Sequence, residues 1–170
     1  PGLGVLTKEL TARAKKVTSI ELDRELSRVL QELIPAKNLT ILNQDALQFT
    51  PQKGPYKVVA NIPYNITSPL LNHFLQALNK PRTITLLIQK EVAEKICKID
   101  PDMSVLSLQV ALFGTPSLIS AVPKTAFYPI PRVDSAIIHI EIHEKTDENY
   151  IPDEQALKIL KTAKLAFSGA

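Results

Sequence analysis

The sequence of 170 residues has no tryptophan and a single cysteine, Cys97. One cysteine cannot form an intramolecular disulfide, and it cannot supply the thiolates of a cysteine-based metal site. The three histidines, His73, His139 and His143, have no cysteine or carboxylate at metal-ligand spacing, and we interpret them as structural. The sequence therefore predicts no metal centre.

Long apolar stretches are missing too, although hydrophobic residues make up 45% of the chain. A membrane-spanning helix needs about 20 consecutive apolar residues, and no segment reaches that length or resembles a secretory signal. We therefore expect a globular cytoplasmic protein with no membrane part, made of one domain and part of a second. The net charge of +3 is compatible with an anionic partner but is too small to identify one.

Apolar runs of strand length alternate with helical patterns in the first half of the chain. Strands are expected at 17–21, 39–43, 57–60 and 83–88. Helices with one apolar face are expected from Asp23 to Leu33 and after Thr67. This alternation is typical of βαβ units in a parallel sheet. The runs 57–60 and 83–88 are apolar on both faces, which predicts buried strands covered by helices.

The second half of the chain predicts a helix and then an antiparallel hairpin. We expect a turn at 100–102, a helix over 104–113, and paired strands at 118–122 and 136–142, where apolar and polar residues alternate. A polar linker follows at 145–149, and a helix with one apolar stripe begins at Asp153. These features predict a domain over 1–144, followed by the first helix of a small second domain over 145–170.

Three of the expected strands end in a side chain that can hydrogen-bond a ligand: Glu21, Asp45 and Asn61. Open α/β sheets bind their ligands at the carboxyl ends of their parallel strands. One polar residue at such a position is chance, whereas three along one edge of a sheet indicate a site.

Gly2 and Gly4 form a glycine-rich turn ahead of a helix, where a backbone can approach a ligand closely. Glu21 follows at about the spacing at which a carboxylate binds both ribose hydroxyls of a nucleoside. Alternatively, Glu21 only caps the helix that begins at Asp23.

The stretch Asn61–Tyr64 combines an amide, a proline and an aromatic ring. Pro63 has no amide hydrogen for the sheet, so it ends the strand and frees nearby carbonyls. Asn61 adds a neutral acceptor, and Tyr64 offers a flat ring suited to stacking on a heterocycle. A strand-to-helix turn that serves folding alone would explain the proline, but not an amide beside a ring.

A proline-rich loop over 123–134 carries two further aromatic residues, Phe127 and Tyr128. Because prolines stiffen the loop, it can present these rings to a ligand at low entropic cost. Alternatively, the two rings plug the end of the sheet.

In order and spacing, these stretches resemble the ribosomal RNA adenine N6-methyltransferases, and most of all the small-subunit adenine dimethyltransferases. The resemblance extends from residue 1 to about 144, and it depends on the segments 1–7, 20–23, 44–47, 61–66 and 127–135. It implies a Rossmann-like α/β fold, with the sheet and flanking helices of class I S-adenosylmethionine-dependent methyltransferases. The start of a small helical C-terminal domain would follow.

The resemblance implies that S-adenosylmethionine is the cofactor. Gly2 and Gly4 would pass close to its amino-acid end, Glu21 would bind the ribose hydroxyls, and Asp45 with the backbone of Ala46 would contact its adenine. The partner would be ribosomal RNA or the immature small subunit, and the enzyme would be a monomer.

At the target base, Asn61 and the backbone beside Pro63 would accept hydrogen bonds from the adenine amino group, and Asn61 would also lie at the cofactor. Tyr64 and Phe127 would hold the ring after the base has flipped out of its helix or loop. The implied activity is N6,N6-dimethylation of adenine, which contributes to ribosome biogenesis.

The sequence departs from the family pattern at two places. The family has an acidic residue and one more glycine ahead of Pro1, at the end of a central strand, so we expect the natural protein to include that first strand. The segment Met103–Ser107 lacks the usual Gly-Arg pair, so no substrate contact is assigned to it.

Three other functions remain open. A dinucleotide-dependent dehydrogenase would share the glycine turn and Glu21, but it would have no use for Asn61–Tyr64. A non-catalytic nucleic-acid-binding relative, such as a transcription factor, would have no need to keep the whole site. A large-subunit rRNA methylase of the macrolide-resistance type would have the same site, but Ser68–Leu71 and Val133–Ser135 favour the small-subunit enzyme.

Overall fold

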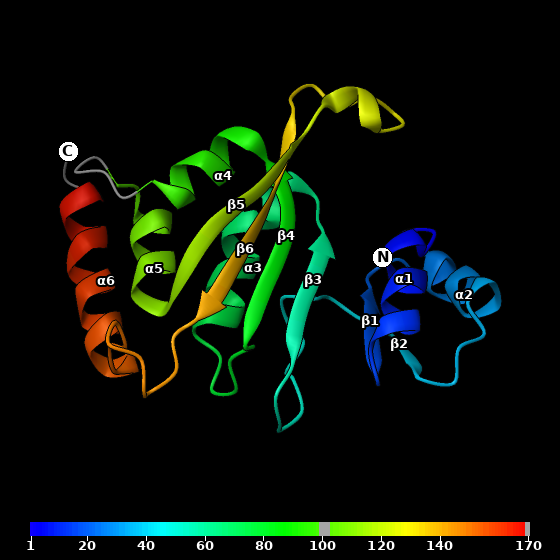
Figure 1. Ribbon diagram of the computed structural model, residues 1–170, viewed down its shortest axis with the longest axis horizontal. Helices are drawn as coiled ribbons and strands as arrows, with labels where there is room; N and C mark the ends of the chain where they lie inside the picture. The colour runs from blue at the N-terminus through cyan, green and yellow to red at the C-terminus, as the bar shows by residue number, and fades with distance from the viewer. Residues whose placement is uncertain (99–102, 169–170) are drawn as a thin grey trace. The chain divides into compact units, whose positions relative to one another are not determined.

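The computed structural model describes residues 1–98 and 103–168, and the chain divides into two compact units, 1–51 and 52–170 (Figure 1). The turn expected at 100–102 lies outside the described residues. Each unit combines strands with helices, as the alternating sequence pattern predicts.

The first unit is a βαβ arrangement preceded by a helix. Its elements are α1 (Val5–Arg13), β1 (Val17–Glu21), α2 (Arg24–Leu33) and β2 (Leu39–Asn43). The strands β1 and β2 pair in parallel, with Glu21 opposite Asn43. The carboxylate of Asp23 accepts the amide hydrogens of Glu25 and Leu26 and so caps α2.

The second unit contains a mixed four-stranded sheet with the order β3-β4-β6-β5 (Figure 1). Its elements are β3 (Lys57–Asn61), η1 (Tyr64–Ile66), α3 (Thr67–Leu75), β4 (Thr83–Gln89), α4 (Lys90–Cys97), α5 (Val105–Phe113), β5 (Gly114–Val122), η2 (Lys124–Ala126), β6 (Ser135–Ile142) and α6 (Asp153–Ser168). The strands β3 and β4 are parallel, and β6 is antiparallel to both of its neighbours, β4 and β5. The predicted hairpin is confirmed, and its second strand lies inside the sheet.

The core of the second unit lies between the inner strands and the helices. Ile84, Leu86 and Ile88 of β4 alternate with half-buried residues and are fully or almost fully buried. Buried residues of the neighbouring elements complete this core: Leu71, Leu75, Ile96, Val110, Ile138 and Ile140. Burial of this much aliphatic surface is the main favourable contribution to folding of the unit.

The prediction that 57–60 is a buried strand is wrong. No residue of β3 is buried, and Val59 remains 37% exposed. Within the described residues β3 pairs on one side only, with β4, and an edge strand has fewer neighbours to cover it. The prediction for 83–88 holds for one face of β4, whose other face is half-buried.

Parallel strand pairs and an antiparallel hairpin are both present, as expected from the sequence. The described strands form a parallel pair, β1 and β2, and a separate mixed sheet of four strands. Parallel pairing therefore holds between β1 and β2 and between β3 and β4. The antiparallel part comes from the hairpin, because antiparallel neighbours can be joined by a loop, here 123–134, without a crossover helix.

The last helix, α6, packs against α5 within the second unit. Ala156 and Leu160 of its apolar stripe are buried, whereas Phe167 is largely exposed. At its start Asp153 forms an ion pair with Lys80, whose ammonium lies 5.5 Å from the centre of the Phe113 ring. No helix of the described residues is both long and apolar enough to cross a membrane.

Candidate functional site

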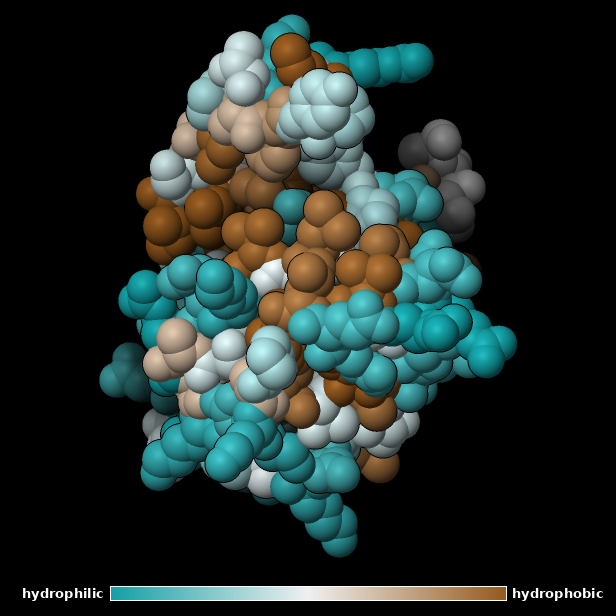
Figure 2. Space-filling model, turned by 90° about the vertical axis from the view of Figure 1, so that its right-hand side faces the viewer, coloured by the Kyte–Doolittle hydropathy of each residue, from teal (hydrophilic) through white to brown (hydrophobic). Residues whose placement is uncertain are grey.

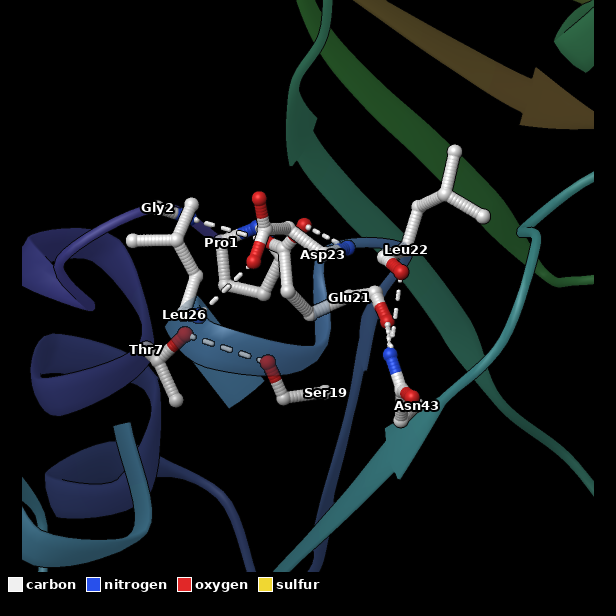
Figure 3. A network of polar contacts seen from close by, with 9 residues as sticks. All are labelled: Pro1, Gly2, Thr7, Ser19, Glu21, Leu22, Asp23, Leu26 and Asn43. Carbon is white, nitrogen blue, oxygen red and sulfur yellow. Dashed lines mark hydrogen bonds and ion pairs between the residues drawn. The ribbon is translucent and has the colours of Figure 1, made fainter. Parts of the chain in front are cut away.

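The glycine turn lies directly beside the end of β1 (Figure 3). The backbone amide of Gly2 donates to Oε2 of Glu21 at 3.2 Å, and that of Asp23 donates to Oε1 at 3.0 Å. Gly2 adopts a positive φ of 56°, and no atom of the described residues lies within 4 Å of the position that a Cβ would occupy. The backbone at Gly2 is therefore open to a close approach.

Gly4 differs from Gly2, although it too has a positive φ, of 83°. A Cβ at Gly4 would clash with the side-chain methyls of Leu30 and Ile34. Glycine is therefore needed here for packing of the turn against α2, as well as for its conformation.

The Glu21 carboxylate is held in its charged form. Partial burial raises its pKa, but the backbone hydrogen bonds from Asp23 and Gly2 act in the opposite direction, and the pKa is lowered from its ordinary value of 4.5. An ionised carboxylate is a strong acceptor for paired hydroxyl groups.

The helix-cap alternative for Glu21 is not supported, because Asp23 itself caps α2. Oδ1 of Asp23 accepts the amides of Glu25 at 2.8 Å and Leu26 at 3.0 Å. Glu21 instead joins the end of β1 to the glycine turn.

Sequence reasoning missed Asn43, which holds the end of β1 from the neighbouring strand (Figure 3). Its Nδ2 donates to the carbonyls of Glu21 at 2.9 Å and Leu22 at 3.0 Å, and the amide of Gln44 donates to the Glu21 carbonyl at 3.1 Å. The sequence feature that could have indicated this role is the position of Asn43 at the last residue of the neighbouring parallel strand, β2.

Asp45 and Ala46 form a turn just beyond β2. Oδ1 of Asp45 accepts the amide of Leu47 at 2.9 Å, and its carbonyl accepts that of Gln48 at 3.1 Å. The bond to Leu47 uses only one of the two carboxylate oxygens of Asp45. Asp45 and Ala46 are both half-buried.

Large apolar side chains reach the surface of the first unit around these polar groups. Figure 2 shows one face of the molecule, on which apolar and polar surface alternate. Leu3, Val5 and Leu22, which adjoin the glycine turn and Glu21, are all exposed. A carboxylate beside apolar surface suits a nucleoside, which has hydroxyl groups and a flat apolar ring.

In the second unit, β3 ends at the exposed Asn61, and the proline stops the strand as predicted. The Pro63 carbonyl accepts the Ile66 amide at 3.1 Å, which leaves one of its two lone pairs for another donor. Oγ1 of Thr67 donates to the Tyr64 carbonyl at 3.0 Å. These local bonds build the turn that holds Asn61 and Tyr64.

The proline-rich loop is anchored at its end. Oδ1 of Asp134 accepts the amide of Lys124 at 2.9 Å, and the Asp134 carbonyl accepts that of Lys90 at 3.0 Å. Tyr128 is 100% exposed, so it does not plug the sheet, whereas Phe127 is half-buried.

The candidate residues fall into two groups. Gly2, Gly4, Glu21, Asp45 and Ala46 belong to the first unit, and Asn61, Pro63, Tyr64 and Phe127 belong to the second. Hydrogen bonds join Gly2 to Glu21 in the first unit, and in the second they join Tyr64 to Ser135, at the end of the proline-rich loop.

Comparison with solved structures shows the class of fold to which the chain belongs. The crystal structure of the 23S rRNA methyltransferase ErmE is similar to the whole chain, with a TM-score of 0.83 and 31% identity, and the chain covers 68% of it. A dimethyladenosine transferase from Plasmodium falciparum matches 84% of the chain and 53% of its own length, with a TM-score of 0.76 and 31% identity. The chain has the Rossmann-like α/β fold of S-adenosylmethionine-dependent methyltransferases.

The family follows from the sequence comparisons. Residues 1–156 match the model of the ribosomal RNA adenine dimethylase family, and the chain belongs to that family. Membership excludes the dinucleotide-dependent dehydrogenase as an alternative.

Two relatives share the description "Ribosomal RNA small subunit methyltransferase A". One, from Dehalococcoides mccartyi, is 47% identical over 84% of the chain and 51% of its own length. The other, from Fusobacterium nucleatum, is 36% identical over 99% of the chain and 65% of its own length. The chain spans about half the length of several relatives that it matches.

Proposed function

We propose that the protein transfers methyl groups from S-adenosylmethionine to N6 of adenine in small-subunit ribosomal RNA, producing N6,N6-dimethyladenosine during ribosome biogenesis. The observation that carries this proposal is the family match over residues 1–156, which includes Glu21, Asn61–Tyr64 and the loop before Ser135. Relatives described as small-subunit methyltransferases support the choice of RNA.

In the cofactor part of the proposed site, the Glu21 carboxylate binds the ribose hydroxyls. Its low pKa supports this role, because it remains an acceptor at neutral pH. The open backbone at Gly2 allows the amino-acid end of the cofactor to approach, next to the turn at Gly4. Asp45 and the Ala46 backbone bind the cofactor adenine.

In the substrate part, the amide oxygen of Asn61 and the backbone beside Pro63 accept hydrogen bonds from the adenine amino group. The lone pair of this nitrogen is spread into the ring, and acceptors that draw its hydrogens out of plane help to localise it toward the methyl group. Tyr64 and Phe127 hold the flipped ring. Because the cofactor supplies the reactive carbon, these residues mainly position and polarise the base.

No strong general base is required in this scheme. The nitrogen that attacks the methyl carbon would become a cationic amine as the methyl–sulfur bond of the cofactor breaks, and this amine readily loses a proton to water or to a backbone acceptor. A neutral Asn61 places no fixed anion beside the nitrogen, which allows a second transfer to the methylated amine.

The proposed enzyme is a cytoplasmic monomer that acts on the immature small subunit. Its methyltransferase domain covers 1–144, and the helix within 145–170 opens a small second domain. The strongly exposed Tyr128 and the neighbouring Arg132 provide stacking and positive charge for the RNA around the target adenine.

The test is incubation of the full-length protein with radiolabelled S-adenosylmethionine and immature small ribosomal subunits. We expect label in the small-subunit RNA, recovered as N6,N6-dimethyladenosine and mapped by mass spectrometry of RNA fragments. RNA binding without any label would instead favour a non-catalytic relative.

The second candidate is methylation of large-subunit RNA, because the 23S rRNA methyltransferase ErmE has a TM-score of 0.83 to the whole chain. Large-subunit RNA is therefore included as a parallel substrate. Label on that RNA alone would contradict the small-subunit assignment and support the second candidate.

A further inference from the structure

Ser135 lies at the first position of β6, in the interior of the four-stranded sheet. It is opposite Gln89 of β4 on one side and Val122 of β5 on the other, and it is 0% exposed. Its backbone is therefore held by strands on both sides.

The hydroxyl group of Ser135 has a partner far away in the sequence. Buried polar groups in native proteins are almost always hydrogen-bonded, and Oγ of Ser135 lies 2.7 Å from Oη of Tyr64, 71 residues earlier in the chain. A buried serine in this apolar strand is thus explained by the tyrosine that it contacts.

The same hydrogen bond restricts the Tyr64 ring. The Tyr64 backbone is already held by the turn, since its carbonyl accepts the Thr67 hydroxyl at 3.0 Å. What remains is rotation about the two side-chain torsions. The hydrogen bond at the tip opposes rotation about the first torsion, which would swing the ring away from Ser135, whereas Oη lies on the axis of the second torsion and does not move when the ring turns about it. The ring is still half-exposed and can be reached by a ligand.

The residue before Ser135 anchors the loop that carries the other aromatic candidate. Asp134 binds the amide of Lys124 through its side chain and that of Lys90 through its carbonyl. Asp134 and Ser135 therefore connect both Tyr64 and the proline-rich loop, which carries Phe127, to the start of β6.

We propose that Ser135 is a positioning residue for methyl transfer: its buried hydroxyl fixes the position at which the Tyr64 ring meets the target adenine. The proposal rests on the proposed function, because it takes adenine as the ligand of the ring. Ser135 acts through Tyr64 and does not itself contact the substrate.

The alternative to this proposal is that Ser135 only stabilises the sheet through one buried hydrogen bond. Ser107 offers a matched control for this role. It is also buried, and its hydroxyl donates to the Lys95 carbonyl at 2.9 Å and lies 2.8 Å from Oγ of Ser104. Replacement of either serine by alanine removes a buried hydrogen bond, but only Ser135 is bonded to Tyr64.

The first experiment is a double-mutant cycle in the full-length protein with Ser135→Ala, Tyr64→Phe, their combination and Ser107→Ala. We expect Ser135→Ala and Tyr64→Phe each to lower kcat by about threefold to tenfold, the usual range for one hydrogen bond. The combination is expected to be no worse than either change alone, because both remove the same bond. The KM for S-adenosylmethionine is expected to stay the same, and Ser107→Ala is expected to keep the wild-type kcat.

The second measurement needs no turnover. Carbon-13 relaxation of the Tyr64 ring is expected to report greater ring mobility in Ser135→Ala and unchanged mobility in Ser107→Ala. Unchanged mobility in Ser135→Ala, or fully additive losses of kcat in the double variant, would overturn the proposal. If the wild-type protein labels no RNA while the mobility difference is present, the proposed function fails and the positioning of Tyr64 by Ser135 stands.

Discussion

At the scale of single residues, Asn61 is the side chain on which the proposed chemistry depends most. We expect Asn61→Ala to lower the transfer rate by about 100-fold to 1000-fold, the usual effect of removing one polarising group. Cofactor affinity should fall only modestly, because Glu21 and the glycine turn remain. Single-turnover transfer and equilibrium binding of S-adenosylmethionine measure the two effects separately.

The matched control for this change is Asn65→Ala, which removes another exposed asparagine, within η1. It should transfer methyl groups at the wild-type rate. An Asn61→Ala variant as active as this control would remove Asn61 from its proposed role.

Glu21 leads to a prediction about pH. Because its pKa is lowered from 4.5 in the folded protein, its contribution to stability is present above about pH 4.5 and is lost as the pH falls through the folded-state pKa. We expect Glu21→Gln to lose less stability than the wild type on acidification through this range. Urea unfolding at a series of pH values measures the difference, and parallel pH profiles for both proteins would contradict it.

At the scale of elements, the packing of the glycine turn on α2 can be tested with two glycines. Gly4→Ala is expected to cost about 1–3 kcal/mol of stability, because the added methyl overpacks the site at Leu30 and Ile34. Gly2→Ala, which also has a positive φ but has nothing within 4 Å of the new Cβ, carries only the backbone strain. The midpoints of urea unfolding should rank Gly4→Ala below Gly2→Ala, and equal midpoints would argue against overpacking.

The proline-rich loop is an element whose exposed ring can be tested in the same way. Tyr128→Ala is expected to weaken binding of an adenine-containing RNA hairpin by about 5-fold to 100-fold, the range for loss of one stacked base. Leu78→Ala is the control, because Leu78 is also fully exposed. It precedes the start of β4, whereas the proline-rich loop lies at the end of that strand. Fluorescence anisotropy measures both affinities, and equal affinities would show that the loop does not stack on RNA.

At the scale of the whole molecule, the chain is a pair of compact units, each with its own sheet. Except for Asn61, the residues proposed for the cofactor lie in the first unit, and those proposed for the base lie in the second. We therefore expect changes at Glu21 to act mainly on cofactor affinity and changes at Tyr64 mainly on the transfer step. Cofactor binding and single-turnover transfer, measured on Glu21→Gln and Tyr64→Phe, test this separation.

The sequence by itself determined the features that depend on neighbouring residues. Asp23 caps α2, Pro63 ends β3, and the alternating residues of β5 and β6 form a hairpin. Each follows from a local rule, such as a missing amide hydrogen or a side chain that reaches an amide two or three positions away. The polar strand ends were predictable for the same reason.

Tertiary structure alone decided the features that depend on distant partners. Among the described residues β3 pairs with β4 on one side only and is exposed, and β6 is inserted between β4 and β5. The bonds from Asn43 to the end of β1 and from Ser135 to Tyr64 join residues 21 to 71 positions apart. Such contacts depend on strand order and register, which local patterns of polarity do not specify.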